Sequence, residues 1–389
     1  NVAITTVFPT APVANFSVDN TTQTIGATVT TAIFTDLSLN IPDSWAWNIT
    51  GPGAVTYVNG TSATSQNPQV QFTQGGVYSV SLIATNTAGS DTKTETNYIT
   101  VNVIYCASNA TSTADEEIFG VEFAGIDNAS DCSTTGGGAS VLNQYSDFTA
   151  VTPAEVAQNY TFPFTLDASA CGTGTYSSGW SVFIDYNGDG DFADLDEKVL
   201  GSVATTPIPP GSPAGSTITT FTGNITIPAT SIIGLTRMRV VLTESNATPT
   251  ACGTYGFGET EDYLININPE PTTPPNCPAT VTVTNQSCIT TTGLSWTPAT
   301  GFPSGYYVYL ATEFPMVNYL LFQENVNAAL SINLPALAPN TTYYYHISPY
   351  NVFGENATCL ATAGTFVSGV SQAITPNQSV NSYKITSEG

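Results

Sequence analysis

The stretch from Trp180 to Leu200 constrains the fold more than any other part of the chain, because it joins a strand pattern to regularly spaced acidic residues. It reads WSVFIDYNGDGDFADLDEKVL. Val182 and Ile184 alternate with polar neighbours, as in a half-buried strand. Oxygen-bearing side chains then follow at every second position, and Gly190 provides a sharp turn. The segment predicts two strands joined by a loop whose side chains converge on one point.

The spacing of this loop matches a calcium ligand set. Ca²⁺ takes roughly six to eight oxygen ligands, which an EF-hand loop supplies from fixed positions around a glycine. The corresponding ligands here are Asp185, Asn187, Asp189, the backbone carbonyl of Asp191, and the closing acid Asp196. No helical pattern flanks the loop, so we predict a Ca²⁺ ion that stabilises a β domain. A solvated acidic turn is the alternative, because Asp, Asn and Gly are common in turns.

The charge balance excludes several partners. Only 9% of the 389 residues are charged, and the net charge of −24 arises because the chain has just five Lys and Arg residues. Such a chain cannot grip phosphates, so we exclude nucleic acid as a partner. Anionic lipid is disfavoured for the same reason, and no apolar run reaches the length of a membrane span.

The cysteines predict an extracellular protein. They are scattered without a C-x-x-C pair, which argues against redox and zinc-ribbon motifs, and disulfides in an oxidising compartment fit better. No signal peptide opens the sequence, so we expect that processing has removed one. The cysteines are Cys106, Cys132, Cys171, Cys252, Cys277, Cys288 and Cys359.

The histidine content argues against catalysis. His346 is the single histidine, so every Ser-His-Asp or Cys-His triad would need it. It lies in the strand-like run TTYYYHISPY, where we expect a structural role. Paired carboxylates remain the one common hydrolytic route, and we predict that the chain is not an enzyme.

Residues 11–103 carry many short β-type runs with turn signals between them, which predicts a β-sandwich. Residues 1–10 alternate enough to form one further strand, with a linker as the alternative. The alternation of Tyr78, Val80 and Leu82 predicts one inward face, and we expect Trp45 or Trp47 in the core, with ligand stacking as the alternative.

This segment resembles a PKD domain, an immunoglobulin-like module of cell-surface proteins. The motifs that carry the resemblance are Phe34-Thr35-Asp36, Ser44-Trp45-Ala46-Trp47, Asn67-Pro68, Phe72, Gly76-Val77-Tyr78-Ser79-Val80, Asn86 and Gly89-Ser90-Asp91.

Residues 104–268 resemble the bacterial GEVED domain, which is named after an acidic motif near its end. That motif stands here as Gly258-Glu259-Thr260-Glu261-Asp262-Tyr263, with Thr in place of Val. The resemblance implies an extracellular β-rich module. Other matching residues are Tyr105-Cys106, Glu116-Glu117-Ile118, Val121, Gly125, Ile227-Pro228, Thr236-Arg237-Met238-Arg239-Val240 and Cys252-Gly253.

The acidic motif lies near two of the few basic residues. Arg237 and Arg239 occupy alternate positions and therefore share one side of a strand. We expect Glu259, Glu261 and Asp262 to pair with them across strands. Alternatively these acids support the metal, as Asp194 and Glu197 also could, or form half of a catalytic carboxylate pair.

Residues 269–276 form a stiff Pro-rich linker, and residues 277–368 resemble a fibronectin type III domain. The runs GLSWTP, GYYVYLAT and TTYYYHISPY carry the resemblance. It implies core positions for Trp296, Tyr307, Leu337, Tyr343 and Tyr345. Residues 369–389 form a polar C-terminal tail. The fold class is therefore all-β, with three tandem sandwich-type domains.

The resemblance of the third domain to bacterial relatives implies that Cys277 pairs with Cys359. For the preceding domain we predict Cys106–Cys132 and Cys171–Cys252, although sequence alone cannot fix connectivity. Cys288 is left as a buried thiol or an alternative partner of Cys277. Glycosylation sequons are scattered and weakly diagnostic; examples are Asn48, Asn109, Asn224 and Asn340.

These features predict a secreted structural or adhesive protein. Lysine normally protects sheet edges from one another, and this chain is poor in lysine. We therefore expect a subunit that self-associates by strand addition into a filament or surface layer, stabilised by calcium and disulfides. The alternatives are a fragment of a larger adhesin, and an accessory module that binds carbohydrate or other surface proteins.

Overall fold

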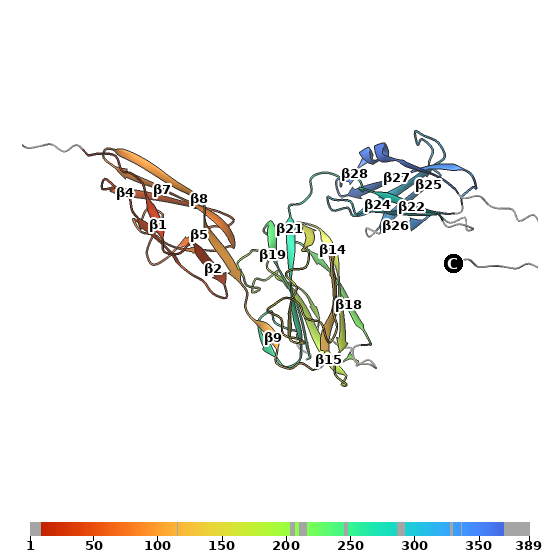
Figure 1. Ribbon diagram of the computed structural model, residues 1–389, viewed down its shortest axis with the longest axis horizontal. Coiled ribbons are helices and arrows are strands. Elements are labelled where there is room, and N and C mark those ends of the chain that lie inside the picture. Colours follow the sequence, from red (N-terminus) through yellow and green to blue (C-terminus); the bar gives the residue numbers. More distant parts are fainter. Residues whose placement is uncertain are drawn as a thin grey trace, which may run out of the picture. The chain divides into compact units, whose positions relative to one another are not determined.

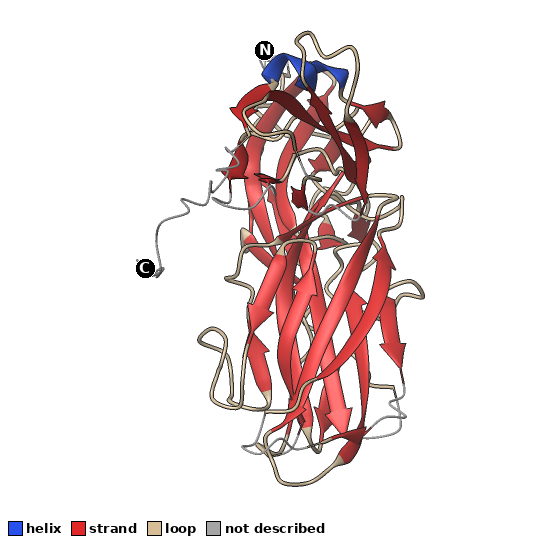
Figure 2. Cartoon of the chain, turned by 90° about the vertical axis from the view of Figure 1, so that its right-hand side faces the viewer, coloured by secondary structure: helices blue, strands red, loops and turns tan. Residues whose placement is uncertain are grey.

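Strands make up nearly all of the regular structure in a computed structural model of the chain (Figure 2). The structure describes residues 9–114, 116–202, 207–209, 216–244, 248–285, 292–326, 330–335 and 337–368. The one helix among them is the short 3₁₀ helix η1, Ala357–Thr362. The all-β prediction is therefore confirmed. Most of the predicted N-terminal strand and the whole C-terminal tail lie outside the described residues.

The chain divides into two compact units, Asn1–Glu270 and Pro271–Gly389. This point of division falls inside the predicted linker, residues 269–276. The two largest hydrophobic clusters among the described residues of the first unit are separate, one within residues 16–103 and one within residues 118–267. Its division into two domains stays a prediction, which these clusters support.

The first part of unit one is a sandwich of two four-stranded sheets (Figure 1). One sheet has the order β1-β3-β6-β5 and the other β2-β8-β7-β4. The strands are β1 Phe16–Val18, β2 Thr22–Gly26, β3 Ala32–Asp36, β4 Ser44–Thr50, β5 Val55–Tyr57, β6 Gln69–Phe72, β7 Gly76–Asn86 and β8 Gly89–Ile104.

Period-two burial builds the core of this sandwich. Tyr78, Val80 and Leu82 on β7 are fully buried, as their alternation predicts. Trp47 is buried among the core aromatic rings. Trp45 is half-buried against the same core, and its indole N–H donates to Asp36 over 2.8 Å. Both tryptophans therefore pack in the fold.

The second part of unit one also consists of two facing sheets. One has the order β11-β10-β14-β18; the other has the order β12-β21-β19-β15-β16, with β13 beside β21 and β17 beside β15, and β9 pairs with β20 separately. The strands are β9 Ser108–Ala110, β10 Glu116–Phe123, β11 Ile126–Ala129, β12 Tyr145–Asp147, β13 Ala154–Ala157, β14 Thr161–Ala170, β15 Tyr176–Ile184, β16 Lys198–Ser202, β17 Pro207–Ile208, β18 Thr219–Thr226, β19 Gly234–Glu244, β20 Gly253–Tyr255 and β21 Gly258–Asn268.

Unit two is a smaller sandwich. Its sheets have the orders β22-β23-β26 and β25-β24-β27-β28, with β29 paired to β27. The strands are β22 Val281–Asn285, β23 Thr292–Trp296, β24 Gly305–Ala311, β25 Leu321–Val326, β26 Ser331–Asn333, β27 Thr342–Asn351, β28 Gly354–Glu355 and β29 Gly364–Val367.

The structure confirms the predicted core residues of unit two with one exception. Trp296, Tyr343 and Tyr345 are buried, and Leu337 packs against them half-buried. Tyr307, however, is not a core residue, because its neighbour Tyr306 faces the core and is only 1% exposed. The run GYYVYL places tyrosines on both faces of β24, and a shift of one residue exchanges the two faces.

The disulfides require a second correction. The bond between Cys277 and Cys359 forms as expected. In the preceding domain the bonds are Cys106–Cys252 and Cys132–Cys171, not the predicted pairs. Sheet order explains the difference. Cys106 and Cys252 directly precede the paired strands β9 and β20, and Cys132 and Cys171 lie just beyond strands that flank β10. The described residues do not include Cys288.

Candidate functional site

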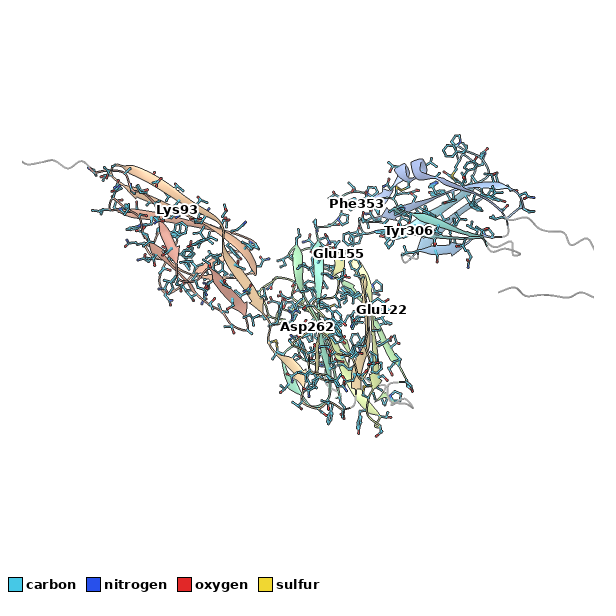
Figure 3. All side chains as sticks on the ribbon, viewed as in Figure 1. Lys93, Glu122, Glu155, Asp262, Tyr306 and Phe353 are labelled. Carbon is cyan, nitrogen blue, oxygen red and sulfur yellow. A yellow bond between two sulfur atoms is a disulfide. The ribbon has the colours of Figure 1, made fainter. Side chains whose placement is uncertain are left out.

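The acidic motif lies on strand β21, in the middle of a sheet. This strand pairs with β19, so that Asp262 lies opposite Arg239 and Glu261 lies opposite Val240. Asp262 occupies the interior of the domain (Figure 3). Successive side chains of a strand point to opposite faces, so Glu259 and Glu261 lie on the face opposite to Asp262.

Asp262 is held by both arginines. Its Oδ1 accepts from Arg239 Nε over 2.7 Å, and its Oδ2 accepts from Arg239 Nη2 over 2.8 Å and from Arg237 Nη1 over 2.7 Å. Burial would raise the pKa of Asp262, but the hydrogen bonds and charge of Arg239, together with Arg237, hold this pKa below its usual value. The predicted cross-strand pairing is confirmed for Asp262.

Arg239 also binds backbone on both sides of a disulfide. Its Nη1 donates to the carbonyl of Cys106 over 2.9 Å and to that of Ala251, next to Cys252, over 2.8 Å. Its guanidinium lies over the ring of Phe192. A single buried arginine thus joins the acidic motif, the entry to the domain and the acidic loop.

Glu259 and Glu261 pair with neither arginine, which corrects the prediction for these two residues. Glu259 accepts from the hydroxyl of Ser146 over 2.8 Å and from the backbone N–H of Ile118 over 3.2 Å. Glu261 accepts from the hydroxyl of Tyr263 over 2.7 Å. Strand alternation explains the outcome, because both arginines lie on the other face.

The environment of these two glutamates favours their protonated forms. Burial raises the pKa of Glu259 to about 7. Burial, and then the charge of Glu259, raise the pKa of Glu261 well above its usual value. A cavity of about 520 Å³ in the domain is lined by residues that include Tyr105, Arg237 and Asp262, whereas neither glutamate lines it. Both glutamates are therefore buried, and they lie outside this cavity.

The acidic loop follows β15 directly, and backbone N–H groups of the loop donate hydrogen bonds to the side chain of Asp185. Asp185 accepts from Gly188 N over 2.6 Å and from Gly190 N over 3.0 Å. Gly188 and Gly190 both have positive φ, which glycine tolerates without strain. Asn187 Nδ2 donates to Asp189 over 3.0 Å and to Asp194 over 2.6 Å, so it lies between these two carboxylates.

The closing acid of the loop differs from the sequence pattern. Asp196 is exposed, whereas Glu197 is fully buried and accepts from Tyr186 N over 3.1 Å and from Asp194 N over 3.3 Å. Asp191 is exposed and caps the N–H of Ala193. The chain leaves this loop as a strand, and Glu197 O accepts from Ile184 N, which turns position 197 toward the loop.

Two carboxylates of the loop are buried without a basic partner. The ion pairs among the described residues are Lys93–Glu95, Arg237–Asp262 and Arg239–Asp262. Burial raises the pKa of Asp185, and burial together with Asp185 raises the pKa of Glu197 to about 8. A bound divalent cation would offset the free-energy cost of burying these two carboxylates in their ionised form.

The donor set of the loop fits Ca²⁺ in chemistry. Carboxylates, a side-chain amide and backbone carbonyls are the ligands of this hard cation. Within the described residues, no three His, Cys, Asp or Glu side chains already converge as a metal cluster. Binding would therefore require the side chains of Asp189 and Asp194 to turn toward Asp185, with Glu197 rather than Asp196 as the inner acid.

The predicted glycosylation sites and His346 are not part of the acidic loop or of the acidic motif. Asn48, Asn224 and Asn340 are exposed and Asn109 is half-buried. His346 lies in unit two and is 6% exposed. Sequence reasoning did not identify the buried Glu197 as the inner acid, nor the outward-facing tyrosines of β24 and β27. In the described residues no helix is both long enough and apolar enough to cross a bilayer.

Comparisons with known proteins recognise part of the chain. Several solved structures resemble it at low identity: chicken CNTN1 FN1–FN3 domains (14% identity, 93% of this chain and 100% of that chain, TM-score 0.22), titin domains A168–A170 (12%, 92% and 99%, 0.21) and a two-domain fibronectin type III segment of chicken tenascin (12%, 55% and 94%, 0.21). The search of curated proteins found no match. The PKD resemblance stays a prediction. The family model of the GEVED domain matches residues 179–266, the segment that holds both the acidic loop and the arginine-bound motif.

Proposed function

We propose that the chain is a non-enzymatic, multidomain protein of the cell surface or extracellular space, with a structural or adhesive role. The observation that carries this proposal is the use of the GEVED acids. Asp262 is neutralised by two arginines, and Glu259 and Glu261 are satisfied inside the core. These three acids, which the sequence offers as candidates for carboxylate catalysis, therefore have structural contacts within the β-sandwich.

Three disulfides support an extracellular location. The GEVED match and the predominance of β-sandwich architecture support a surface or adhesion-type protein. Calcium belongs to this proposal as a stabilising ion of the loop at residues 185–197. Extracellular modules bind calcium weakly, with dissociation constants of roughly 10⁻⁴ to 10⁻³ M, so the loop is a structural site and not a sensor.

Within this class we propose self-association by strand addition. Strand β18 ends the order of a sheet and contains no charged residue. Exposed edges of this kind are normally blunted by lysine or other charges. Neutral edges would therefore let another copy of the chain add a strand.

Negative-stain electron microscopy and light scattering of the full chain in calcium test self-association. We expect concentration-dependent oligomers or filaments. Thr222→Lys, on the exposed face of β18, should reduce them, whereas Thr230→Lys, in the exposed turn that follows β18, should not. Discrete monomers at every concentration would refute strand addition while leaving the surface role intact.

A further inference from the structure

The outer face of the β24–β27 sheet carries an unusual layer of aromatic residues. In both strands the side chains alternate between the core and the outside. The pairing places Tyr309 opposite His346, Tyr307 opposite Ser348, and Ala311 opposite Tyr344. The positions on this face are mainly aromatic: Tyr309 and His346 are buried in a small second cluster, and Tyr307 and Tyr344 are half-buried around it.

Ring contacts hold this layer together. Tyr307 and Tyr350 stack with centroids 4.5 Å apart, and Tyr309 and His346 stack at 4.2 Å. Tyr319 covers the second pair, with its centroid 4.7 Å from that of Tyr309. These contacts fix the rings in place without placing them in the sandwich core.

A second group of apolar side chains lies beside this layer and is exposed to solvent. Phe314 is 59% exposed and lies 5.7 Å from the ring of Tyr344, while Tyr319 is 44% exposed. Val317 and Leu320, in the same connection between β24 and β25, are also exposed. Folding of unit two alone does not account for so much exposed apolar surface on one connection.

Polar groups lie within and beside the rings. Tyr309 donates its hydroxyl hydrogen to Glu355 over 2.8 Å, and Glu313 accepts from the side chain of Asn318 over 2.7 Å. His346 Nδ1 is buried and has no hydrogen-bond partner.

We propose that this aromatic face, defined by Tyr307, Tyr309, Phe314, Tyr319, Tyr344, His346 and Tyr350, binds a neutral polysaccharide. The face of an aromatic ring has negative potential, which attracts the weakly positive C–H groups of a sugar ring. Sugar rings would stack on the exposed Phe314 and Tyr319, and sugar hydroxyls would hydrogen-bond to Asn318 and to the hydroxyl of Tyr319.

Charge selects the neutral glycan among ligands that stack on aromatic rings. The five basic residues of the chain are Lys93, Lys198, Arg237, Arg239 and Lys384. The described residues of unit two, which carry the aromatic face, include no Lys or Arg, whereas Glu313 and Glu355 lie beside the face. Sulfated or uronic polysaccharides and nucleic acids would meet negative charge with no counter-ion there. The inference goes beyond the proposed structural role and does not depend on self-association.

Affinity electrophoresis of the full chain tests the proposal. The gels contain cellulose-type β-1,4-glucan, β-1,3-glucan, mannan or galactan, with alginate and heparin as charged probes. We expect retardation by at least one neutral glycan and by neither charged one. Tyr319→Ala should weaken binding roughly 3- to 10-fold, and adding Phe314→Ala should weaken it further.

Two controls make the result decisive. Phe257→Ala removes an exposed aromatic ring from unit one and should leave binding unchanged. Unchanged melting curves of the Tyr319 and Phe314 variants would show that unit two still folds. No retardation by any neutral glycan, equal loss in Phe257→Ala, or variants that lose only self-association would overturn the proposal; the last result would assign the face to a second copy of the chain.

Discussion

The two faces of strand β21 place carboxylates in opposite electrostatic surroundings. On one face, Asp262 accepts three hydrogen bonds from the guanidinium groups of Arg237 and Arg239. On the other face, Glu259 and Glu261 accept hydrogen bonds from neutral donors; burial raises the pKa of both, and the charge of Glu259 raises that of Glu261 further. One strand therefore contains an acid that must be ionised and a pair that favours protonation.

This contrast shows that a cluster of acids in a sequence does not imply a shared role. The domain buries carboxyl groups on both faces of the strand. On one face arginines neutralise the carboxylate, and on the other face burial favours the protonated, uncharged form. The acidic loop also buries two carboxyl groups, those of Asp185 and Glu197, and we propose that a bound cation neutralises them.

Removal of Arg239 should have the largest effect. Arg239→Met leaves the buried Asp262 with Arg237 alone and should lower the free energy of unfolding by about 3–5 kcal/mol. Arg237→Met removes one hydrogen bond from a partly exposed arginine and should cost only about 1–2 kcal/mol. Urea denaturation of the full chain measures both.

Lys93→Met supplies the control for these variants, because the ion pair of Lys93 with Glu95 is partly exposed and should contribute at most about 1 kcal/mol. Equal losses for the Arg239 and Lys93 variants would mean that the arginine-bound face is not special.

Calcium removal should have an intermediate effect. Transfer of the chain from about 10 mM Ca²⁺ into EDTA should lower the melting temperature of the domain at residues 104–268 by roughly 5–10 °C, because a site with a dissociation constant of about 10⁻⁴ M is near saturation at that concentration. Differential scanning calorimetry measures the shift. Asp189→Asn should reduce the difference, while Asp127→Asn, at an exposed position of β11, should preserve it. An identical melting curve in both buffers would refute the calcium proposal.

A pH change should have the smallest effect and tests the second face. The pKa of Glu259 is about 7 in the folded domain, above its usual 4.5. The folded state therefore binds a proton that the unfolded state releases, so this stability is complete below about pH 4.5 and is lost as the pH rises toward 7. With calcium saturating, we expect the domain to be less stable at pH 8 than at pH 5 by about 2 kcal/mol.

Glu261→Gln should flatten this pH dependence, because it removes one titrating group and the charge that opposes ionisation of Glu259. Glu122→Gln, at an exposed position of β10 (Figure 3), should leave the dependence unchanged. A stability that rises between pH 5 and pH 8 would show that the glutamate pair is ionised in the folded state.

Alternation of side chains predicted much of the fold and the arginine-bound half of the site. The pattern at Tyr78, Val80 and Leu82 determines a face unambiguously because polar residues separate the apolar ones. The pairing of Asp262 with Arg239 follows from the same period on adjacent strands. Local sequence is sufficient wherever neighbouring residues differ in polarity.

The errors arose where local sequence is ambiguous or tertiary order decides. Tyr306 and Tyr307 are chemically identical, so their order gives no indication of which faces the core. The disulfide partners follow from strands that meet in space and not in sequence. Glu197 rather than Asp196 is buried against the loop because the chain continues as strand β16, and the calcium role of both residues stays a prediction.

The bond between Cys106 and Cys252 gives the GEVED domain a defined response to mechanical load. The chain enters at Tyr105 and leaves after β21, and the crosslink spans 146 residues between these points. Tension applied along the chain would pass through the sulfur atoms and then along residues 253–268. Residues 107–251, which include the acidic loop, would lie outside the covalent line of force, and β21, which carries the load, is held by its pairing with β19.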